Sequence, residues 1–234
     1  MRCGVVSFPG SLDDADTVHA LSDVLGFDGV QLWHKDPDLH GVECVILPGG
    51  FSYGDYLRSG ALARFAPVMD SVIEFAAGGG LVMGLCNGFQ ILCEAGLLPG
   101  ALVRNRSMTF VCDTVHVRIE RSDTPFTNLC ETGDRLELPI KHGEGCYVAD
   151  EESLRRIEDS GRVVVRYSDA SGETTEAANL NGSLNSIAGV VNEAGNVFGM
   201  MPHAEHACED LLGLEDGAII FRSIEAWLRR DLRS

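Results

Sequence analysis

Residues 81–92 have the sequence LVMGLCNGFQIL, in which a short apolar run passes directly into a cysteine flanked by glycines. The run LVMGL (81–85) predicts a fully buried strand, and the residues from 87 to about 95 predict a helix. Gly84 and Gly88 stand two positions either side of Cys86, which is the G-x-nucleophile-x-G arrangement of a sharp strand-to-helix turn. The stretch therefore predicts an α/β fold with a reactive side chain at the carboxyl end of a strand.

The segments around this stretch extend the same pattern. Strands are predicted at 3–8, 29–34 and 43–48, and helices after a cap at Ser11 or Asp13 and around 68–76. This alternation indicates an α/β protein with a mostly parallel open sheet and helices on both faces. An antiparallel extension with acidic loops is predicted farther on, from TVHVRI, LELPI, RVVVRY, SIAGVV and NVFGM. A closing helix is expected at about 217–232, and one domain over 1–234.

The composition is strongly acidic. The chain has 35 Asp and Glu residues against 18 Lys and Arg, which gives a formal net charge of −17. This balance argues against a nucleic-acid partner and against docking to an anionic membrane, because both require a basic face. Only Lys35 and Lys141 are lysines, and an acidic, lysine-poor surface suits high salt. A salt-loving source is a hypothesis that a circular-dichroism salt titration would test.

The eight cysteines lie far apart and form no C-x-x-C pair. Most are therefore expected to be small buried hydrophobes in a reducing compartment. No apolar run approaches the roughly 20 residues of a membrane span. The first residues also lack the layout of a signal peptide. We therefore expect an intracellular, cytoplasmic protein.

Cys86 is the one cysteine whose context indicates chemistry. At a helix N-terminus, unpaired N–H groups and the positive end of the helix dipole favour its thiolate. The same N–H groups can stabilise an oxyanion, with the amide of Asn87 as the first donor. The alternative on local evidence is a structural cysteine beside glycines that serve helix packing.

A catalytic cysteine needs a base, and MPHAEH (201–206) offers one. In an extended segment, side chains two residues apart point the same way, so Glu205 would hold one ring nitrogen of His203 and leave the other for the thiol. A solvated turn is one alternative. A zinc site of His203, His206 and Cys208 is another, although its spacing matches no structural zinc pattern. The H-x-E of zinc deaminases requires a downstream P-C-x-x-C, which is absent. No metal is expected.

The turn PGGFSYGD (48–55) follows the predicted strand at 43–48. It lacks the G-K-[ST] ending of a P-loop and the G-x-G-x-x-G spacing of dinucleotide-binding folds. Its glycines let backbone N–H groups approach a ligand, so Gly50 or Phe51 would supply a second oxyanion donor. A tight turn without a ligand is the alternative.

Together, the P-G-G turn, the G-x-C-x-G-x-Q elbow and the late H-x-E resemble the class I (triad) glutamine amidotransferases. Five blocks narrow this resemblance to the glutaminase subunits of phosphoribosylformylglycinamidine synthases, and they occur in a consistent order from residue 48 to residue 203. They are PGGFSYGDYLRSGA (48–61), GLCNGFQIL (84–92), RNRSMTF (104–110), PIKHGEGCY (139–147) and NGSLNSIAGVVNEAGNVFGMMPH (181–203). The family commonly has proline and arginine where this chain has Ala204 and His206, a departure that leaves both triad side chains in place.

The resemblance implies a fold with a flavodoxin-like core and a set of site residues. Cys86, His203 and Glu205 would form the catalytic triad. Gly50, Phe51 and Asn87 would provide the oxyanion hole. The implied glutamine contacts are Gln90, Ser107, His142 and Glu144.

The resemblance also implies an enzyme that hydrolyses glutamine to glutamate and ammonia through a cysteinyl thioester. The ammonia would pass to a large ATP-dependent synthetase subunit, which uses ATP and Mg²⁺ to make formylglycinamidine ribonucleotide in de novo purine biosynthesis. A small bridging subunit is a further expected partner, and the chain itself is expected to need no cofactor. One alternative is another thiol hydrolase, such as a γ-glutamyl hydrolase or a dienelactone-type enzyme, although the latter places its acid before its histidine. A non-catalytic glutamine-binding subunit is disfavoured, because no triad member is missing.

Overall fold

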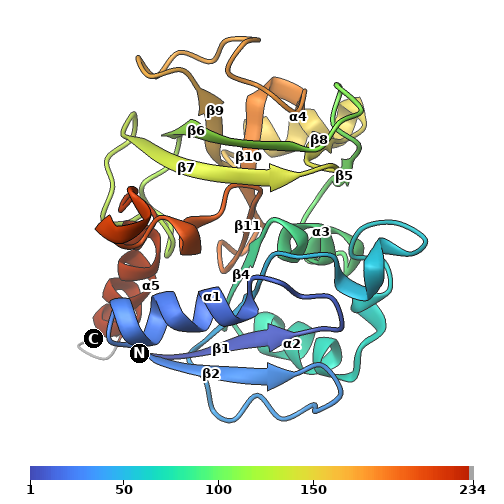
Figure 1. Cartoon of the computed structure of the whole chain (residues 1–234), viewed down its shortest axis with the longest axis vertical. Helices are drawn as coiled ribbons and strands as arrows, with labels where there is room; N and C mark the ends of the chain where they lie inside the picture. The colour runs from blue at the N-terminus through green and yellow to red at the C-terminus, as the bar shows by residue number, and fades with distance from the viewer. Residues whose placement is uncertain (232–234) are drawn as a thin grey trace.

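The computed structural model describes residues 1–231, and its main feature is a nine-stranded mixed sheet. The strand order is β2-β1-β3-β4-β11-β10-β9-β6-β7 (Figure 1). The strands of this sheet are β1 (Arg2–Ser7), β2 (Asp28–Trp33), β3 (Cys44–Leu47), β4 (Leu81–Leu85), β6 (Val111–Ile119), β7 (Arg135–His142), β9 (Val163–Ser168), β10 (Ile187–Val191) and β11 (Val197–Met200). Two short strands, β5 (Ala101–Val103) and β8 (Cys146–Val148), pair with each other in a separate sheet.

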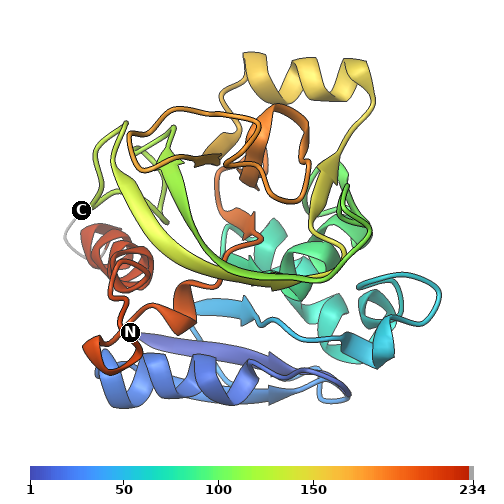
Figure 2. The ribbon, with the colours of Figure 1, turned by 45° about the horizontal axis from the view of Figure 1, so that its top comes forward.

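The large sheet has a parallel half and an antiparallel half. In the parallel half, β2, β1, β3, β4 and β11 pair side by side in the same direction. In the antiparallel half, β10, β9, β6 and β7 continue the sheet from β11 with alternating directions. Figure 2 shows the long curved ribbon that β6 and β7 form. This topology confirms the expected α/β sheet with an antiparallel extension. One strand is corrected: NVFGM was expected in the extension, but it forms β11, which pairs parallel with β4.

Helices cover both faces of the sheet because alternate residues of each buried strand point to opposite sides. On β3, Ile46 packs in the core under α1, its π-helical continuation and α5, whereas Leu47 packs in the core under α2, α3 and α4. The helices are α1 (Asp14–His19, continued at Ala20–Val24), α2 (Pro67–Ala77), α3 (Asn87–Glu94), α4 (Glu151–Asp159) and α5 (Ala218–Asp231). Single helical turns are η2 (Ser52–Asp55), η3 (Ala63–Phe65), η4 (Leu184–Ser186), η5 (Ala204–His206) and η6 (Asp210–Leu212).

Helix α4 corrects one expectation, since it lies in a segment that the sequence predicted as an acidic loop. The Asp150 carboxylate caps the helix by accepting a hydrogen bond from the Ser153 N–H (2.9 Å). Leu154 and Ile157, three residues apart, pack on the core. The acidic composition of the segment concealed this short apolar face. The predicted end of the closing helix, residue 232, lies outside the described residues.

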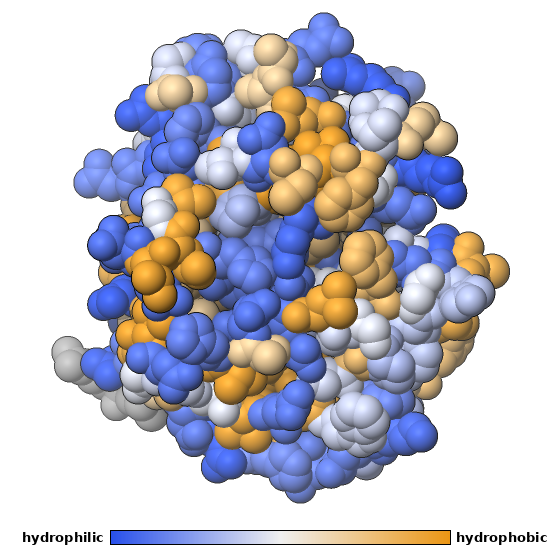
Figure 3. All heavy atoms as spheres, in the orientation of Figure 1, coloured by the Kyte–Doolittle hydropathy of each residue, from blue (hydrophilic) through white to orange (hydrophobic). Residues whose placement is uncertain are grey.

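The surface facing the viewer in Figure 3 is mostly hydrophilic, and its hydrophobic residues gather in separate groups. None of the helices between residues 1 and 231 combines the length and the apolar character needed to cross a membrane.

Candidate active site

Cys86 occupies the turn between β4 and α3. Its backbone lies at φ +49°, ψ −104°, a conformation that side-chain-bearing residues rarely adopt and that clusters at functional sites. A Cβ on Gly84 would lie 2.6 Å from the Gly88 carbonyl, and a Cβ on Gly88 would collide with the Leu47 carbonyl. The two glycines are therefore required because β3, β4 and the start of α3 approach too closely for side chains.

The order of the strands brings His203 to the same edge of the sheet. β4 and β11 are parallel neighbours, with Leu85 opposite Met200. The chain leaves both strands at one edge, and the Cys86 N–H donates to the Met200 carbonyl (2.8 Å). The His203 N–H donates to the Pro139 carbonyl on β7 (2.9 Å), which fixes the backbone of the histidine. Residues 86 and 203 thus meet although more than a hundred residues separate them.

His203 and Glu205 are buried and form a hydrogen-bonded pair. His203 Nδ1 lies 2.6 Å from Glu205 Oε1, so Nδ1 carries a proton and Nε2 is left for another partner. No nitrogen or oxygen of residues 1–231 bonds that Nε2. Burial lowers the pKa of His203, but the charges of Glu205 and Cys86 and the hydrogen bond to Glu205 outweigh burial and raise it to about 10. The imidazole therefore holds its proton at neutral pH beside the sulfur.

The candidate oxyanion donors differ in availability. The Phe51 N–H already donates to the Gly10 carbonyl (2.8 Å). In the described part of the chain, the N–H groups of Gly50 and Asn87 have no protein acceptor. The Asn87 side chain also accepts a hydrogen bond from the Ser52 N–H (3.1 Å), which ties the glycine turn to the start of α3. This geometry favours Gly50 over Phe51 as the donor from the turn.

A pocket of about 250 Å³ opens in front of Cys86. Some of the residues that line it were assigned a role from the sequence, and others were not. The former are Gly50, Phe51, Cys86, Gln90, His142 and Glu144, and the latter are Asp55, Ser59, Arg104, Met108, Thr109, Phe110, Lys141 and Gly143.

Two of the predicted glutamine contacts are already engaged elsewhere. Both ends of the Gln90 amide bond protein groups, since Oε1 accepts from Asn87 Nδ2 (2.8 Å) and Nε2 donates to the Glu144 carbonyl (2.6 Å). Gln90 therefore shapes the pocket wall through protein contacts. Ser107 is exposed, pairs with the Thr109 hydroxyl (2.9 Å) and does not line the pocket. This geometry does not support Ser107 as a glutamine contact.

His142 and Glu144 lie at the pocket with different charge states. His142 Nδ1 contacts Asn105 Oδ1 (3.1 Å), and burial together with the charge of His203 lowers the pKa of His142 to about 4. His142 is therefore neutral at pH 7. Glu144 accepts a hydrogen bond from the Ser59 hydroxyl (2.6 Å), and its other oxygen lies 3.7 Å from Arg104 Nε. These groups give the pocket both an acidic and a basic side.

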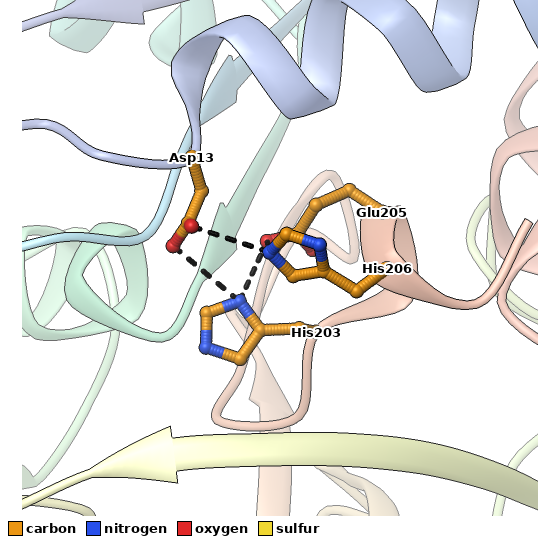
Figure 4. Close-up of side chains that lie close together, drawn as sticks. All are labelled: Asp13, His203, Glu205 and His206. Carbon is orange, nitrogen blue, oxygen red and sulfur yellow. Dashed lines mark hydrogen bonds and ion pairs between the residues drawn. The ribbon is translucent and has the colours of Figure 1, made fainter. Parts of the chain in front are cut away.

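Asp13 and Lys141 belong to the site although the sequence assigned neither of them a role there. Asp13 Oδ2 lies 3.6 Å from His203 Nδ1, and Oδ1 accepts from His206 Nε2 (3.2 Å), as Figure 4 shows. The Lys141 ammonium also pairs with Oδ1. Positions 13, 141 and 203 are distant in the sequence, so only the folded chain reveals the contact.

One atom each of Asp13, His203, Glu205 and His206 lies within 4.8 Å of the others, and these residue types can hold a metal such as zinc. Here these atoms bond one another, so we interpret the group as a hydrogen-bonded ionic network. Cys208, the third member of the zinc alternative, instead donates its Sγ–H to the Ala204 carbonyl (3.1 Å).

Comparisons with known proteins identify the family of the chain. The model of a family described as the CobB/CobQ-like glutamine amidotransferase domain matches residues 1–213. The chain is 56% identical over 223 residues to phosphoribosylformylglycinamidine synthase subunit PurQ of Salinibacter ruber, covering 95% of each chain. It is 53% identical over 231 residues to the subunit of the same name from Nitrobacter winogradskyi, covering 98% of this chain and 99% of the relative.

A similar solved structure is that of PurLQS from Thermotoga maritima. One of its chains superposes with a TM-score of 0.86 and is 46% identical, covering 97% of this chain and 98% of that chain.

Proposed function

The chain belongs to the CobB/CobQ-like glutamine amidotransferase family, and we propose that it is the glutaminase subunit of a phosphoribosylformylglycinamidine synthase. In this role it hydrolyses glutamine and supplies ammonia for the synthesis of formylglycinamidine ribonucleotide in purine biosynthesis. Two relatives named as that subunit, each more than half identical over nearly its full length, support the proposal. The observation that carries the chemistry is the convergence of Cys86, His203 and Glu205 at one edge of the sheet.

In the first half of the reaction, the Cys86 sulfur attacks the side-chain amide carbon of glutamine. The C–O π electrons move onto oxygen, where the N–H groups of Gly50 and Asn87 stabilise the negative charge. As the carbonyl re-forms, the C–N bond breaks and His203 Nε2–H gives its proton to the departing nitrogen. The products are ammonia and a γ-glutamyl thioester on Cys86.

In the second half, water attacks the thioester carbon and His203 Nε2 takes a proton from that water. The second tetrahedral intermediate expels the Cys86 thiolate and releases glutamate. Glu205 holds the Nδ1–H throughout, so that Nε2 remains the nitrogen that exchanges protons with the substrate. The residues of this chain supply each proton acceptor and donor that the two steps require.

The ammonia passes to a partner subunit, which uses it in synthesis. The likeness to a chain of the PurLQS structure supports an assembly with a large ATP-dependent synthetase subunit and a small bridging subunit. ATP and Mg²⁺ belong to the large subunit, and we place the complex in the cytoplasm. Within it, this chain is a single glutamine amidotransferase domain.

Replacing Cys86 by alanine tests this function in the reconstituted complex. Because the thiol acts only on glutamine, Cys86→Ala should abolish glutamine-dependent synthesis and leave synthesis from added ammonium salts largely intact. The matched control is Cys112→Ala, which removes an exposed thiol outside the pocket and should leave both activities unchanged. Equal loss with both nitrogen sources would place Cys86 in folding or assembly and refute its catalytic role.

A further inference from the structure

Asp13 occupies the N-cap position of α1 but does not cap that helix. Its side chain makes no hydrogen bond to the first-turn N–H groups, which is the usual reason for an aspartate at this position. The carboxylate instead turns toward His203 and His206 (Figure 4). A different interaction therefore determines the direction of this side chain.

Two donors hold the carboxylate from the far side. Lys141 Nζ, at the end of β7, and His206 Nε2, in η5, both pair with Oδ1 and leave Oδ2 facing the imidazole of His203. Burial raises the pKa of Asp13, but the His206 hydrogen bond, the charge of His203 and the Lys141 contacts lower it more, to well below its usual range. Asp13 is therefore a permanent negative charge in the site.

Close packing makes this contact specific. A Cβ on Gly49 would collide with Asp13 Oδ2 and lie 2.6 Å from His203 Cε1. The Gly49 carbonyl also accepts from the backbone N–H groups of Leu12 and Asp13, at 3.3 Å each. The carboxylate, the imidazole and the glycine turn that carries the Gly50 N–H are thus packed against one another.

The charged and titratable groups around His203 come from four parts of the chain. They are Asp13 before α1, Cys86 before α3, Lys141 and His142 at the end of β7, and Glu205 and His206 in η5. Asp16 reaches only the outer edge of this network, 3.9 Å from His206 Nε2. Of these groups, Asp13 and Glu205 are the two carboxylates next to Nδ1.

We propose that Asp13 is a second positioning carboxylate for His203, acting beside Glu205 on the Nδ1 side of the ring. It orients the imidazolium together with the glycine turn and stabilises its positive charge. Lys141 and His206 hold Asp13 in place. This role rests on the proposed function, in which His203 exchanges protons with the substrate.

The test is the pH at which His203 loses its proton, followed by ¹H–¹⁵N NMR of the ring nitrogens in the full chain and assigned with His203→Asn. An opposite charge within about 4–6 Å typically shifts a pKa by about one to three units. Asp13→Asn, which keeps the size of the side chain, should therefore lower the titration midpoint of His203 by about one to three pH units. The upper pH limit of kcat for glutamine hydrolysis should move down with it.

Asp14→Asn is the matched control. It removes the same charge one residue away, but Asp14 bonds Ser7 and Gln31 and does not face His203. In Asp14→Asn, the titration midpoint of His203 should equal that of the wild type. An unchanged midpoint in Asp13→Asn, or an equal shift in Asp14→Asn, would overturn the proposal.

Lys141→Gln tests the effect of Asp13 on His203 even if Asp13→Asn does not fold. Without the ammonium, the Asp13 charge acts on His203 uncompensated, so the ring should stay protonated to at least the pH of the wild type. If Asp13 and Lys141 only tethered a loop, losing either partner would loosen the site and lower the midpoint, and that result in Lys141→Gln would contradict the proposal. The NMR titration needs no turnover, so an inactive wild-type complex would count against the proposed function and not against this contact.

Discussion

The parallel and antiparallel halves of the sheet contribute to the site in different ways. The parallel half supplies the glycine turn after β3, Cys86 after β4 and His203 after β11, each within three residues of a strand end. The antiparallel half supplies pocket walls, with Lys141 and His142 as the last two residues of β7 and Glu144 just beyond it. The proposed catalytic groups thus come from the parallel half, which also carries Asp13 and Asp55, and the antiparallel half adds Lys141 and Glu144 to the charges at the pocket.

This difference follows from the geometry of the two pairings. Parallel neighbours end at the same edge of the sheet, so the direction of the strands alone brings the residues that follow them close together. Antiparallel neighbours end at alternate edges, and β7 ends at the same edge as β11 because four antiparallel pairings separate the two strands. β6 and β7 form a long curved ribbon (Figure 2), and the last two residues of β7 line the pocket. We therefore expect a backbone change where β3, β4 and α3 meet to be costly and a change at Gly143, just beyond β7, to be mild.

Gly88→Ala against Gly143→Ala is the sharpest test of this comparison. The added methyl group at position 88 would collide with the Leu47 carbonyl, whereas at position 143 its nearest neighbour is Phe110 Cδ2 at 3.8 Å. Gly88→Ala should lower the free energy of unfolding by about 3 kcal/mol, because backbone contacts cannot relax as side chains do. Gly143→Ala should change it by less than about 0.5 kcal/mol. Urea unfolding curves of the two variants measure both values, and equal losses would break the distinction.

Asp55→Asn probes the contact between the halves with a smaller effect. Asp55 follows the glycine turn, and burial together with the charge of Glu144 raises its pKa from 3.8 to about 6. A folded-state pKa above the unfolded value means that ionised Asp55 destabilises the fold at high pH and costs nothing once it is protonated. Because Asp55 is only half-buried, solvent screens part of its charge, and Asp55→Asn should stabilise the protein by about 1 kcal/mol above pH 6. This gain should disappear as the pH falls to about 4.

Asp70→Asn, an exposed carboxylate on α2, is the control and should show no such pH-dependent gain. In a Glu144→Gln background the stability gain from Asp55→Asn should be smaller, because the Glu144 charge no longer raises the pKa of Asp55. A gain that is independent of pH would show that Asp55 does not carry this unfavourable charge.

The strands β1, β3 and β4 could be predicted from the sequence because they are short, mostly apolar and followed by turns that contain glycine. LVMGL, for example, is observed as β4, the strand predicted for residues 81–85. Helix α4 was missed because charged residues outnumber the two apolar positions that bury it. The separate pair β5 and β8 escaped prediction because strands of three residues carry no measurable period.

The same division applies to the candidate site. Local sequence motifs indicate the catalytic roles proposed for Cys86, His203 and Glu205. Asp13 looked like an ordinary helix cap, and Lys141 and Arg104 lay in quoted sequence blocks without an assigned role, so their place at the site depends on contacts across the fold. Contacts between residues that are distant in the chain cannot be predicted from local patterns in a single sequence.

The central claim, that the Cys86 sulfur attacks glutamine with His203 as its acid and base, has one most direct test. During turnover of glutamine by the reconstituted complex, samples are quenched in acid and the cysteine-containing peptides are weighed by mass spectrometry. The account predicts a transient glutamyl adduct on the Cys86 peptide, present in the wild type and absent from Cys112. Steady ammonia release without an adduct on Cys86, or with the glutamyl group on another cysteine, would contradict it.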